Sequence, residues 1–384
     1  MKFAEPQIQE EDYLKLIKIC FIDVFETNLA KLALIVAFVI ATGLTILQSY
    51  YSINNFTANQ FLKYAPVYFG RFYVLVCLVF IFYYTKVIFK IFDTVPKWKY
   101  ETVSKKYNQH VRRDALYMNY FCLFSVLAGL CTAVLYVIPS EEDHEIFFIV
   151  SWFEDNVLEW ADILSLCLRL SFLFVSYLMQ APCFQMCYLL RHIQYQMGIL
   201  KFYMRNIHHG FENLDKLIFD DSFHKEIKRR LEFCIKRHVT IVLIGTTMVR
   251  EGRIFILLFA ISGAMISVSL MMFLFLVERS LPFTYLRLSA LIFTATLTGI
   301  QYIAQGQSIQ NTSEQWFRTL VRIKWYYWNR ENQKSYFIIL NAYKPFSIKF
   351  SQKLAVNYKL GITIAKAVYS IMSFMRYITD HVGN

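Results

Sequence analysis

A stripe of polar side chains runs along the last apolar segment of the chain, through the sequence KAVYSIMSFM at residues 366–375. Hydroxyl and ammonium groups in one row can line a water-filled path for ions, or they can form a polar seam against a neighbouring helix. The stripe by itself leaves both interpretations open. At 100° per residue its members fall within an arc of about 80°: Gln352, Lys359, Thr363, Lys366, Ser370, Ser373 and Tyr377.

Other residue types that carry chemistry show no matching pattern. The sequence has no carboxylate pair spaced for acid–base catalysis, no glycine-rich phosphate loop and no nucleophile motif. We therefore expect no enzyme, no metal site, no cofactor and no disulfide framework. Six of the eight cysteines lie inside apolar segments, where cysteine packs as a small hydrophobic residue: Cys77, Cys122, Cys131, Cys167, Cys183 and Cys187. Four histidines lack zinc-motif spacing and are expected to be structural: His192, His208, His209 and His238.

The elements that position the stripe are expected to be membrane helices. Apolar residues make up 57% of the 384 residues and charged residues only 18%, which exceeds the apolar share of an ordinary soluble domain. The apolar runs are continuous and too few for a membrane β-barrel. Seven of them are long enough to cross the hydrocarbon layer, which takes about 20 helical residues: 32–51, 65–92, 116–138, 163–190, 254–277, 283–305 and 354–378.

The basic residues predict the orientation of these helices, because short cytoplasmic loops retain Lys and Arg. Residues 86–113, 201–237 and 318–344 are rich in Lys and Arg, whereas the loop 139–162 contains neither. The N-terminus is then cytoplasmic, without a cleavable signal peptide, and the C-terminus is extracellular. The net charge of +12 is explained by this topology, so we expect no nucleic-acid partner.

Two other classes of membrane protein fit less well. A heptahelical G-protein-coupled receptor has the opposite orientation, and the acidic-Arg-aromatic triplet and the Asn-Pro-x-x-Tyr motif of that class are absent from this chain. A secondary transporter would show two similar halves with broken helices near the midplane, and no such repeat is visible. Both remain alternatives of lower rank.

Three further segments have helical periodicity and should extend or pack on the cytoplasmic side. Residues 191–204 continue the fourth span, and residues 229–242 precede the fifth. Residues 313–334 are too charged to cross a bilayer, and we expect them to form a third cytoplasmic helix before Pro345 breaks the chain. The apolar stripes of these segments are Ile193, Met197, Leu200 and Met204; Leu231, Cys234, Ile235 and His238; and Trp316, Leu320, Ile323 and Tyr327.

Four of these segments resemble the insect odorant receptors. HIQYQMGIL (192–200) is similar to the segment after helix four, and LEFCIKRHVTI (231–241) to the Cys-Ile-x-x-His segment before helix five. QYIAQGQSIQNTSEQWFRTLVRIKWYYW (301–328) is similar to the helix-six region, and AKAVYSIMSFM (365–375) to the terminal Tyr-Ser motif. The chain lacks the ending of gustatory receptors, although a gustatory-type channel remains an alternative. It also lacks the co-receptor's long insertion between helices four and five, and so resembles a ligand-tuning receptor.

The resemblance implies an odorant-gated, non-selective cation channel in the plasma membrane of olfactory sensory neurons. This chain and the odorant receptor co-receptor would together form a channel of four subunits. Its pore would be lined by the seventh helices, and membrane lipid would surround the outside of the channel. Aligning Ser370 with the terminal motif puts the apolar gate at Phe374 and Ile378, beside Tyr377, with Lys366 on the pore-facing stripe. An apolar pair one turn apart can close a pore by dewetting it.

A pocket for a small volatile ligand is implied in the outer half of the bundle, among helices two, three, four and six. Arg169, in the same region, is expected to form an ion pair or to reach the membrane interface. The residues expected to form the apolar wall are Phe69, Phe72, Tyr73, Val126, Gly129, Ala133, Leu170, Phe174, Phe293 and Thr294.

The expected organisation is an all-α membrane protein of seven transmembrane helices with a cytoplasmic helical anchor domain. Its parts are a cytoplasmic N-terminal segment (1–31), helices one to four with the outer ligand pocket (32–200), a cytoplasmic helical region (201–253), helices five and six (254–311), a cytoplasmic anchor helix (312–346) and the pore-lining seventh helix (347–384).

Overall fold

The computed structural model describes residues 3, 8–54, 57–94, 97–276, 281–343, 345–349 and 355–382. Within these ranges the secondary structure is helical, apart from two isolated β-bridges that pair Ile8 with Trp98 and Lys349 with Ala355. The long helices are α3 (Asn28–Asn54), α4 (Ala58–Thr94), α5 (Lys105–Val137), α8 (Ala161–Arg205), α9 (Asp221–Leu276), α10 (Pro282–Val321) and α12 (Tyr358–Val382). The short ones are α1 (Lys15–Lys18), η1 (Ile19–Asp23), α2 (Val24–Glu26), η2 (Tyr100–Thr102), α6 (Asp143–Ile146), α7 (Phe148–Asn156), η3 (Leu158–Trp160), η4 (Leu214–Leu217), η5 (Trp325–Tyr327) and α11 (Arg330–Ala342).

The long helices confirm the expected all-α class. Of the described residues, six helices are long and apolar enough to cross a membrane, namely α3, α4, α5, α8, α9 and α10. They contain the first six predicted spans apart from residue 138, which follows the end of α5, and residue 277, which lies outside the described residues. The seventh predicted span overlaps α12, whose 25 residues extend about 37 Å at 1.5 Å per residue. Among the described residues α12 is not one of those six helices, and Lys359 and Lys366 interrupt its apolar residues.

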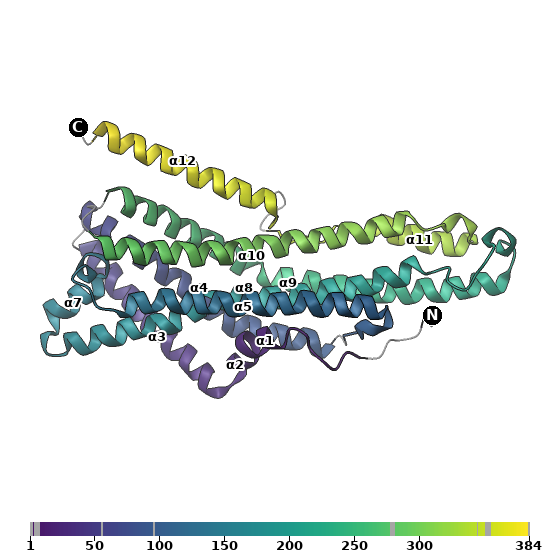
Figure 1. Ribbon diagram of the computed structural model, residues 1–384, viewed down its shortest axis with the longest axis horizontal. Helices are drawn as coiled ribbons and strands as arrows, with labels where there is room; N and C mark the ends of the chain where they lie inside the picture. Colours follow the sequence, from purple (N-terminus) through teal and green to yellow (C-terminus); the bar gives the residue numbers. More distant parts are fainter. Residues whose placement is uncertain are drawn as a thin grey trace.

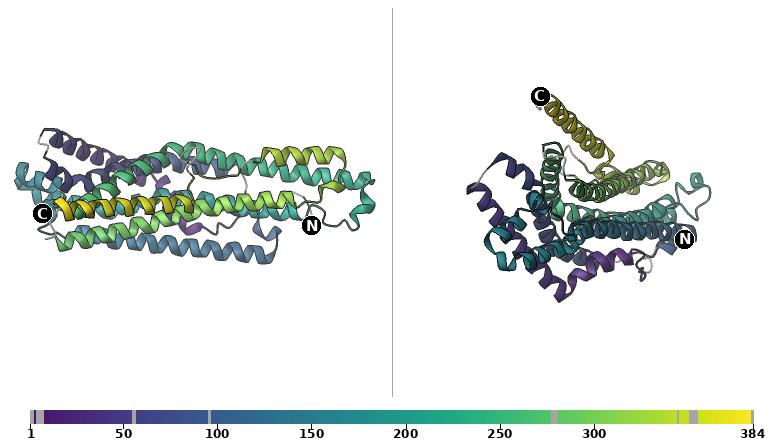
Figure 2. Two further views of the ribbon diagram at one scale, coloured as in Figure 1. Left: turned by 90° about the horizontal axis from the view of Figure 1, so that it is seen from above. Right: turned by 60° about the vertical axis from the view of Figure 1, so that its left-hand side comes forward.

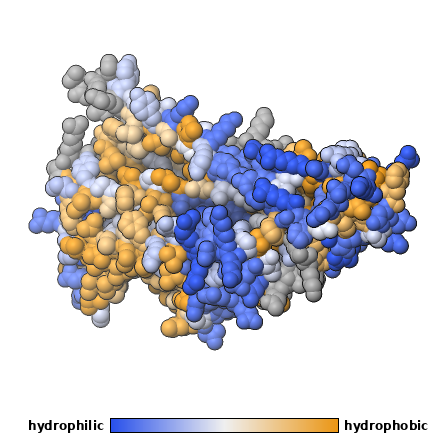
Figure 3. Space-filling model, turned by 45° about the vertical axis from the view of Figure 1, so that its right-hand side comes forward, coloured by the Kyte–Doolittle hydropathy of each residue, from blue (hydrophilic) through white to orange (hydrophobic). Residues whose placement is uncertain are grey.

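The long helices run side by side along the longest axis of the molecule (Figure 1). One end, here called the acidic end, carries the loop residues 139–160 with α6 and α7; the other, the basic end, carries the α8–α9 connection and α11. Figure 3 shows apolar side chains gathered towards one end and polar side chains towards the other. This division suits a protein embedded in lipid over part of its length.

The basic end is closed by the continuations of α8, α9 and α10. The stripe of α8 is buried, with Ile193 and Met197 at 5% exposure and Leu200 and Met204 at 0%. Leu231 of α9 and Trp316 and Leu320 of α10 are buried as well, as are Cys234 and Ile323. Ile235, His238 and Tyr327 of the predicted stripes are half-buried. The helical periodicity of these segments therefore predicted most of the inward-facing residues.

The segment 313–334 differs from its expected single helix. The α10 helix continues to Val321, the chain turns, and α11 starts at Arg330. The side chain of Asn329 caps α11 by accepting a hydrogen bond from the Asn332 amide at 3.0 Å, which favours a new helix at that point. The Tyr336 hydroxyl donates to the Leu320 carbonyl at 2.6 Å and holds α11 against the end of α10.

The N-terminal segment is fixed to α8 through a buried carboxylate. Asp12 Oδ2 accepts hydrogen bonds from Lys97 Nζ at 2.9 Å and from the Tyr188 hydroxyl at 2.5 Å. Burial alone would raise the pKa of Asp12, but His192, Lys97 and Tyr188 stabilise the carboxylate and hold its pKa well below its usual range. A charged Asp12 thus joins the chain before α3 to the basic end.

Candidate functional site

The α12 helix leans away from the rest of the bundle, as the views in Figures 1 and 2 show. It contacts α9 and α10 near its beginning. There Asn357 Oδ1 caps the helix by accepting from the Leu360 amide at 3.1 Å, and Gln307 Oε1 of α10 accepts from the Tyr358 amide at 3.2 Å. The start of α12 is therefore positioned by α10, whereas its later turns have few contacts within this chain.

The segment that leads into α12 crosses α10 at a glycine. A Cβ atom at Gly306 would lie 2.2 Å from the carbonyl oxygen of Val356. No side chain fits between two backbones at this distance. Gly306 thus permits the close crossing that directs α12 along the bundle.

The polar stripe lies on the exposed surface of α12. Lys359, Thr363, Lys366, Ser370 and Ser373 are exposed, as are Phe374 and Tyr377 at 60% each. Gln352 lies outside the described residues, and so does the side chain of Ile378. Apolar residues of the helix are exposed too, among them Ile362 at 59%. The rest of the described chain therefore leaves the polar stripe and much of the apolar face of α12 uncovered.

The residues expected to line a ligand pocket occupy different environments. Gly129 and Ala133 are buried, whereas Phe69, Tyr73, Val126 and Thr294 are half-buried. Phe72, Leu170, Phe174 and Phe293 are exposed on the single chain. Tyr73 packs against Phe259 of α9, with ring centroids 5.4 Å apart. The structure does not gather all ten side chains around one cavity, and their role in ligand binding stays a prediction.

The space that Gly129 leaves on α5 is filled by side chains of α8. A Cβ atom at Gly129 would lie 2.0 Å from Gln180 Nε2 and 2.9 Å from Ser176 Oγ. Gln180 is 6% exposed, and its Oε1 atom has no hydrogen-bond partner. A buried acceptor without a partner is costly, so this seam offers a hydrogen bond to a molecule that separates α5 from α8.

A buried ion cluster joins the acidic end to two long helices. Asp143 of α6 is 1% exposed and lies 2.5 Å from Arg287 Nη1 of α10 and 2.9 Å from Arg169 Nη2 of α8. Arg287 also donates to the carbonyl oxygens of Leu135, at 2.8 Å, and Ile138. The expectation of an ion pair for Arg169 is confirmed, whereas sequence reasoning missed Asp143 and Arg287. The sequence signal that could have identified Arg287 is its position inside the otherwise apolar run 283–305, because an arginine in such a run usually has a charged partner.

The neighbouring residue Glu142 caps α10. Its carboxylate accepts from the amides of Phe283 and Thr284 at 3.2 and 2.6 Å, and from the Thr284 hydroxyl at 2.6 Å. A carboxylate at a helix N-terminus satisfies free amides and complements the helix dipole. Glu142 and the ion cluster together fix the loop at the acidic end. These four residues, Glu142, Asp143, Arg169 and Arg287, are here called the clasp.

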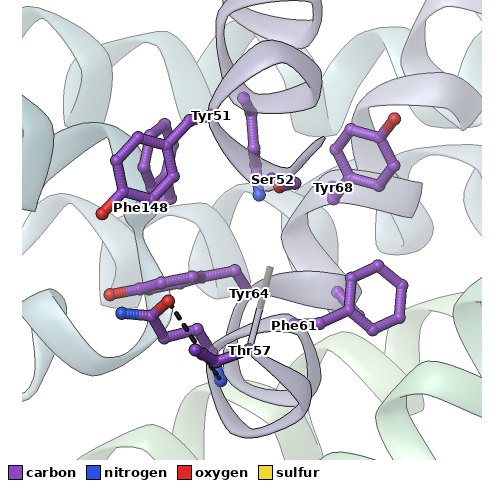
Figure 4. A pocket seen from close by; sticks show the side chains of 10 residues that line it. Tyr51, Ser52, Thr57, Phe61, Tyr64, Tyr68 and Phe148 are labelled. Atoms are coloured by element: carbon purple, nitrogen blue, oxygen red, sulfur yellow. Dashed lines mark hydrogen bonds between the residues drawn. The ribbon is translucent and has the colours of Figure 1, made fainter. Parts of the chain in front are cut away.

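The acidic end also holds a small aromatic pocket between α3, α4 and α7 (Figure 4). Its cavity volume is about 20 Å³, and with its open mouth the empty space is about 360 Å³. The residues that line it are Gln48, Tyr51, Ser52, Thr57, Gln60, Phe61, Tyr64, Ala65, Tyr68 and Phe148. None of them belongs to the predicted wall.

Comparison with known proteins identifies the fold. No protein-family model and no curated protein matches the chain. A solved structure of the insect olfactory receptor OR5 from Machilis hrabei in complex with eugenol matches with a TM-score of 0.69 and 10% identity, over 95% of this chain and 97% of that chain. A second structure of that receptor matches with a TM-score of 0.68 and 10% identity, over 94% and 96%. The chain has the fold of an insect olfactory receptor.

The olfactory receptor fold accounts for the main features of the architecture. The match extends over nearly the whole of both chains, so it includes the basic end as well as the apolar helices. Both matched structures are of a receptor rather than an enzyme. The sequence motifs around residues 192–200, 231–241, 301–328 and 365–375 had indicated this fold although overall identity is low.

Proposed function

We propose that the chain is the odorant-binding subunit of a heteromeric, odorant-gated, non-selective cation channel. The observation that carries the proposal is the full-length match to an olfactory receptor structure, together with an amphipathic α12 whose polar stripe is left exposed by the rest of the chain. A polar stripe on an uncovered helix suits a pore that is completed by neighbouring subunits.

The proposed ligand is a small volatile organic molecule bound towards the acidic end, which the charge pattern makes extracellular. The matched receptor structure holds eugenol, and this supports a ligand of that size class. The proposed wall consists of Phe69, Phe72, Tyr73, Val126, Gly129, Ala133, Leu170, Phe174, Phe293 and Thr294. Such a wall binds mainly by burial, worth about 25 cal/mol per Å² of apolar surface.

Gln180 supplies the polar contact of the proposed site. Its unpartnered Oε1 lies on α8 where that helix meets Gly129 of α5. A ligand that carries a hydroxyl group would donate to this oxygen and displace the Gln180 side chain from its place beside Gly129. Ligand binding would then separate α5 from α8, a movement that α10 shares because it contacts both helices.

The proposed pore uses the stripe of α12, with Lys366 and Ser370 on the path and Phe374, Tyr377 and Ile378 at the gate. The co-receptor is the proposed partner, since the connection between α8 and α9 is short, residues 206–220, and lacks the insertion expected of a co-receptor. The proposed location is the plasma membrane of olfactory sensory neurons.

The test is current recording from cells that express the chain with and without the co-receptor, across a panel of volatiles. We expect odorant-evoked cation current only from cells with both subunits, and an odorant profile that the co-receptor alone does not have. Robust odorant-evoked current from the chain alone would contradict the tuning-subunit role. The absence of any current from the pair across a broad panel would contradict the channel function.

A further inference from the structure

The aromatic pocket at the acidic end has a buried polar atom with no partner. Gln48 of α3 is 3% exposed, lines the pocket, and carries an Oε1 atom without a hydrogen-bond partner. A buried acceptor left unpaired costs about 1–3 kcal/mol. A donor group that enters the pocket would recover this cost.

Several other polar groups near Gln48 are already engaged. The Tyr68 hydroxyl lies 2.9 Å from Ser49 Oγ, and the Tyr64 hydroxyl donates to the His144 carbonyl at 3.1 Å. At the mouth, Thr57 Oγ1 donates to Gln60 Oε1 at 2.9 Å. Among the residues that line the pocket, Gln48 carries the buried side-chain atom without a partner, whereas the hydroxyl-bearing residues Tyr51 and Ser52 are half-buried. A donor group that reaches the buried part of the pocket would therefore bind to Gln48.

The walls of the pocket are aromatic rings from three elements. Phe148 of α7 lies between Tyr51 of α3 and Tyr64 of α4, with centroid distances of 4.6 and 5.8 Å. Figure 4 shows Phe61 and Tyr68 on the opposite side of the opening. Flat rings favour a flat aromatic guest, by burial and by ring–ring contact.

The size of the pocket sets the size of the guest. A cavity of about 20 Å³ has room for one water molecule, which matches a single hydroxyl group beside Gln48. The empty space of about 360 Å³ includes open solvent at the mouth. The ring of a guest would therefore lie in the open mouth, against the aromatic side chains, and only its hydroxyl group would enter the cavity.

We propose that this pocket is a second ligand site, which binds small phenols by donation of the hydroxyl hydrogen bond to Gln48 Oε1. It shares no residue with the proposed odorant wall and does not depend on channel activity. The clasp positions one wall of this pocket. Asp143 is anchored to α8 and α10, and Phe148 lies only five residues after Asp143 in the chain.

The experiment is photolabelling of the purified full-length chain in lipid nanodiscs with a diazirine-bearing phenol, followed by peptide mapping. Phenol and anisole serve as competitors, because they differ in the donor group. We expect the label on peptides of α3 or α7, which carry no residue of the proposed odorant wall, and competition by phenol about tenfold stronger than by anisole, the equivalent of one hydrogen bond.

Two buried glutamines make a matched pair of variants. Gln48→Met should bring the phenol-to-anisole ratio close to one, whereas Gln305→Met, at another buried glutamine with an unpartnered Oε1 atom, should leave it near tenfold. Ala65→Phe, which fills the pocket from α4, should abolish the label. Label confined to other helices, equal competition by anisole and phenol on the wild-type chain, or an unchanged ratio in Gln48→Met would overturn the proposal. The competition of phenol and anisole on the wild-type chain tests the proposal even if a variant does not give a monodisperse protein.

Discussion

At the scale of single residues, the clasp places one carboxylate between two guanidinium groups, away from water. Such a cluster is stable only while it is complete, because each remaining charge keeps its desolvation cost after a partner is removed. Asp143 and Arg287 are 1% and 0% exposed. Substitution of either residue should therefore lower the stability of the folded chain more than substitution of an exposed charged residue.

Asp143→Asn should lower the stability of the folded chain by about 3 kcal/mol, since it leaves the buried Arg287 and the half-buried Arg169 without a full negative charge. The measurement is the midpoint of thermal unfolding of the detergent-solubilised protein. The readout is the fraction of the protein that stays monodisperse at each temperature. Glu145→Gln is the control, because Glu145 pairs with Lys63 in a partly exposed position and should cost less than about 1 kcal/mol. Equal midpoints for the two variants would exclude a structural role for the clasp.

A histidine at the basic end should make stability depend on pH. Burial, with Lys324 and Arg230 nearby, lowers the pKa of His208 to about 4, and His208 Nε2 accepts a hydrogen bond from Trp328 Nε1 at 2.8 Å. In the unfolded chain the pKa is about 6.5. Between these values the unfolded chain binds a proton that the folded chain does not, so stability falls as pH falls from about 6.5 to about 4.

The corresponding measurement is the thermal midpoint between pH 7.5 and pH 4.5. The wild-type chain should lose stability across this window, His208→Gln should lose less, and the exposed neighbour His209→Gln should behave like the wild type. The same pH slope in His208→Gln and in the wild type would contradict the assignment.

At the scale of elements, sequence reasoning worked where structure is local. Apolar runs of about 20 residues predicted seven spans, six of which coincide with described helices long and apolar enough to cross a membrane. Helical periodicity predicted most of the buried stripes of α8, α9 and α10, because it depends on residues three or four positions apart. It merged the end of α10 with the start of α11, since the turn between them is stabilised by Tyr336 reaching Leu320 from another helix.

The sites depend on contacts that no local pattern records. Asp143 and Arg287 are 144 positions apart, and the pocket takes Gln48, Tyr64 and Phe148 from three separate elements. Within its own segment, none of these residues belongs to a sequence pattern that indicates a binding site or an ion cluster. Their chemistry appears only when the fold brings them together, which is why the stripe of α12, a feature of one helix, was found in the sequence and the clasp was not.

Two glycines of α10 test the crossing that positions α12. Gly306→Ala should displace the segment before α12, because the added Cβ atom would meet the Val356 carbonyl oxygen at 2.2 Å. Gly299→Ala is the control, since a Cβ atom there meets nothing within 4 Å and alanine favours a helix. We expect Gly306→Ala to reduce surface assembly with the co-receptor and Gly299→Ala to retain it. Normal assembly of both variants would show that the crossing is dispensable.

On α4, two aromatic residues of the proposed wall should affect odorant sensitivity. Phe72 is exposed and Tyr73 is half-buried in the chain without ligand, so the bound ligand would bury them. Removal of a buried aromatic side chain costs about 3–5 kcal/mol in a core, and a third of that shifts a dose-response curve about tenfold. Phe72→Ala and Tyr73→Ala should each shift the half-maximal odorant concentration while surface expression persists. Unchanged curves for both would place the pocket elsewhere.

At the scale of the whole molecule, the chain is a bundle whose last helix is incomplete by itself. The basic end is tightly packed and the acidic end is held by the clasp, yet α12 leaves both its polar stripe and its apolar residues exposed. This asymmetry is expected of a subunit that contributes one wall to a shared pore. The central claim is therefore that α12 faces permeating ions.

The most direct test of that claim is the permeability of the channel to calcium relative to monovalent cations, with Lys366 changed. If Lys366 faces the path, its charge repels permeant cations, so Lys366→Glu should raise relative calcium permeability and single-channel conductance. The increase should be larger at low ionic strength, where screening is weaker. Lys366→Met, similar in length and uncharged, should give an intermediate value. Normal surface expression with wild-type permeation in both variants would contradict the account.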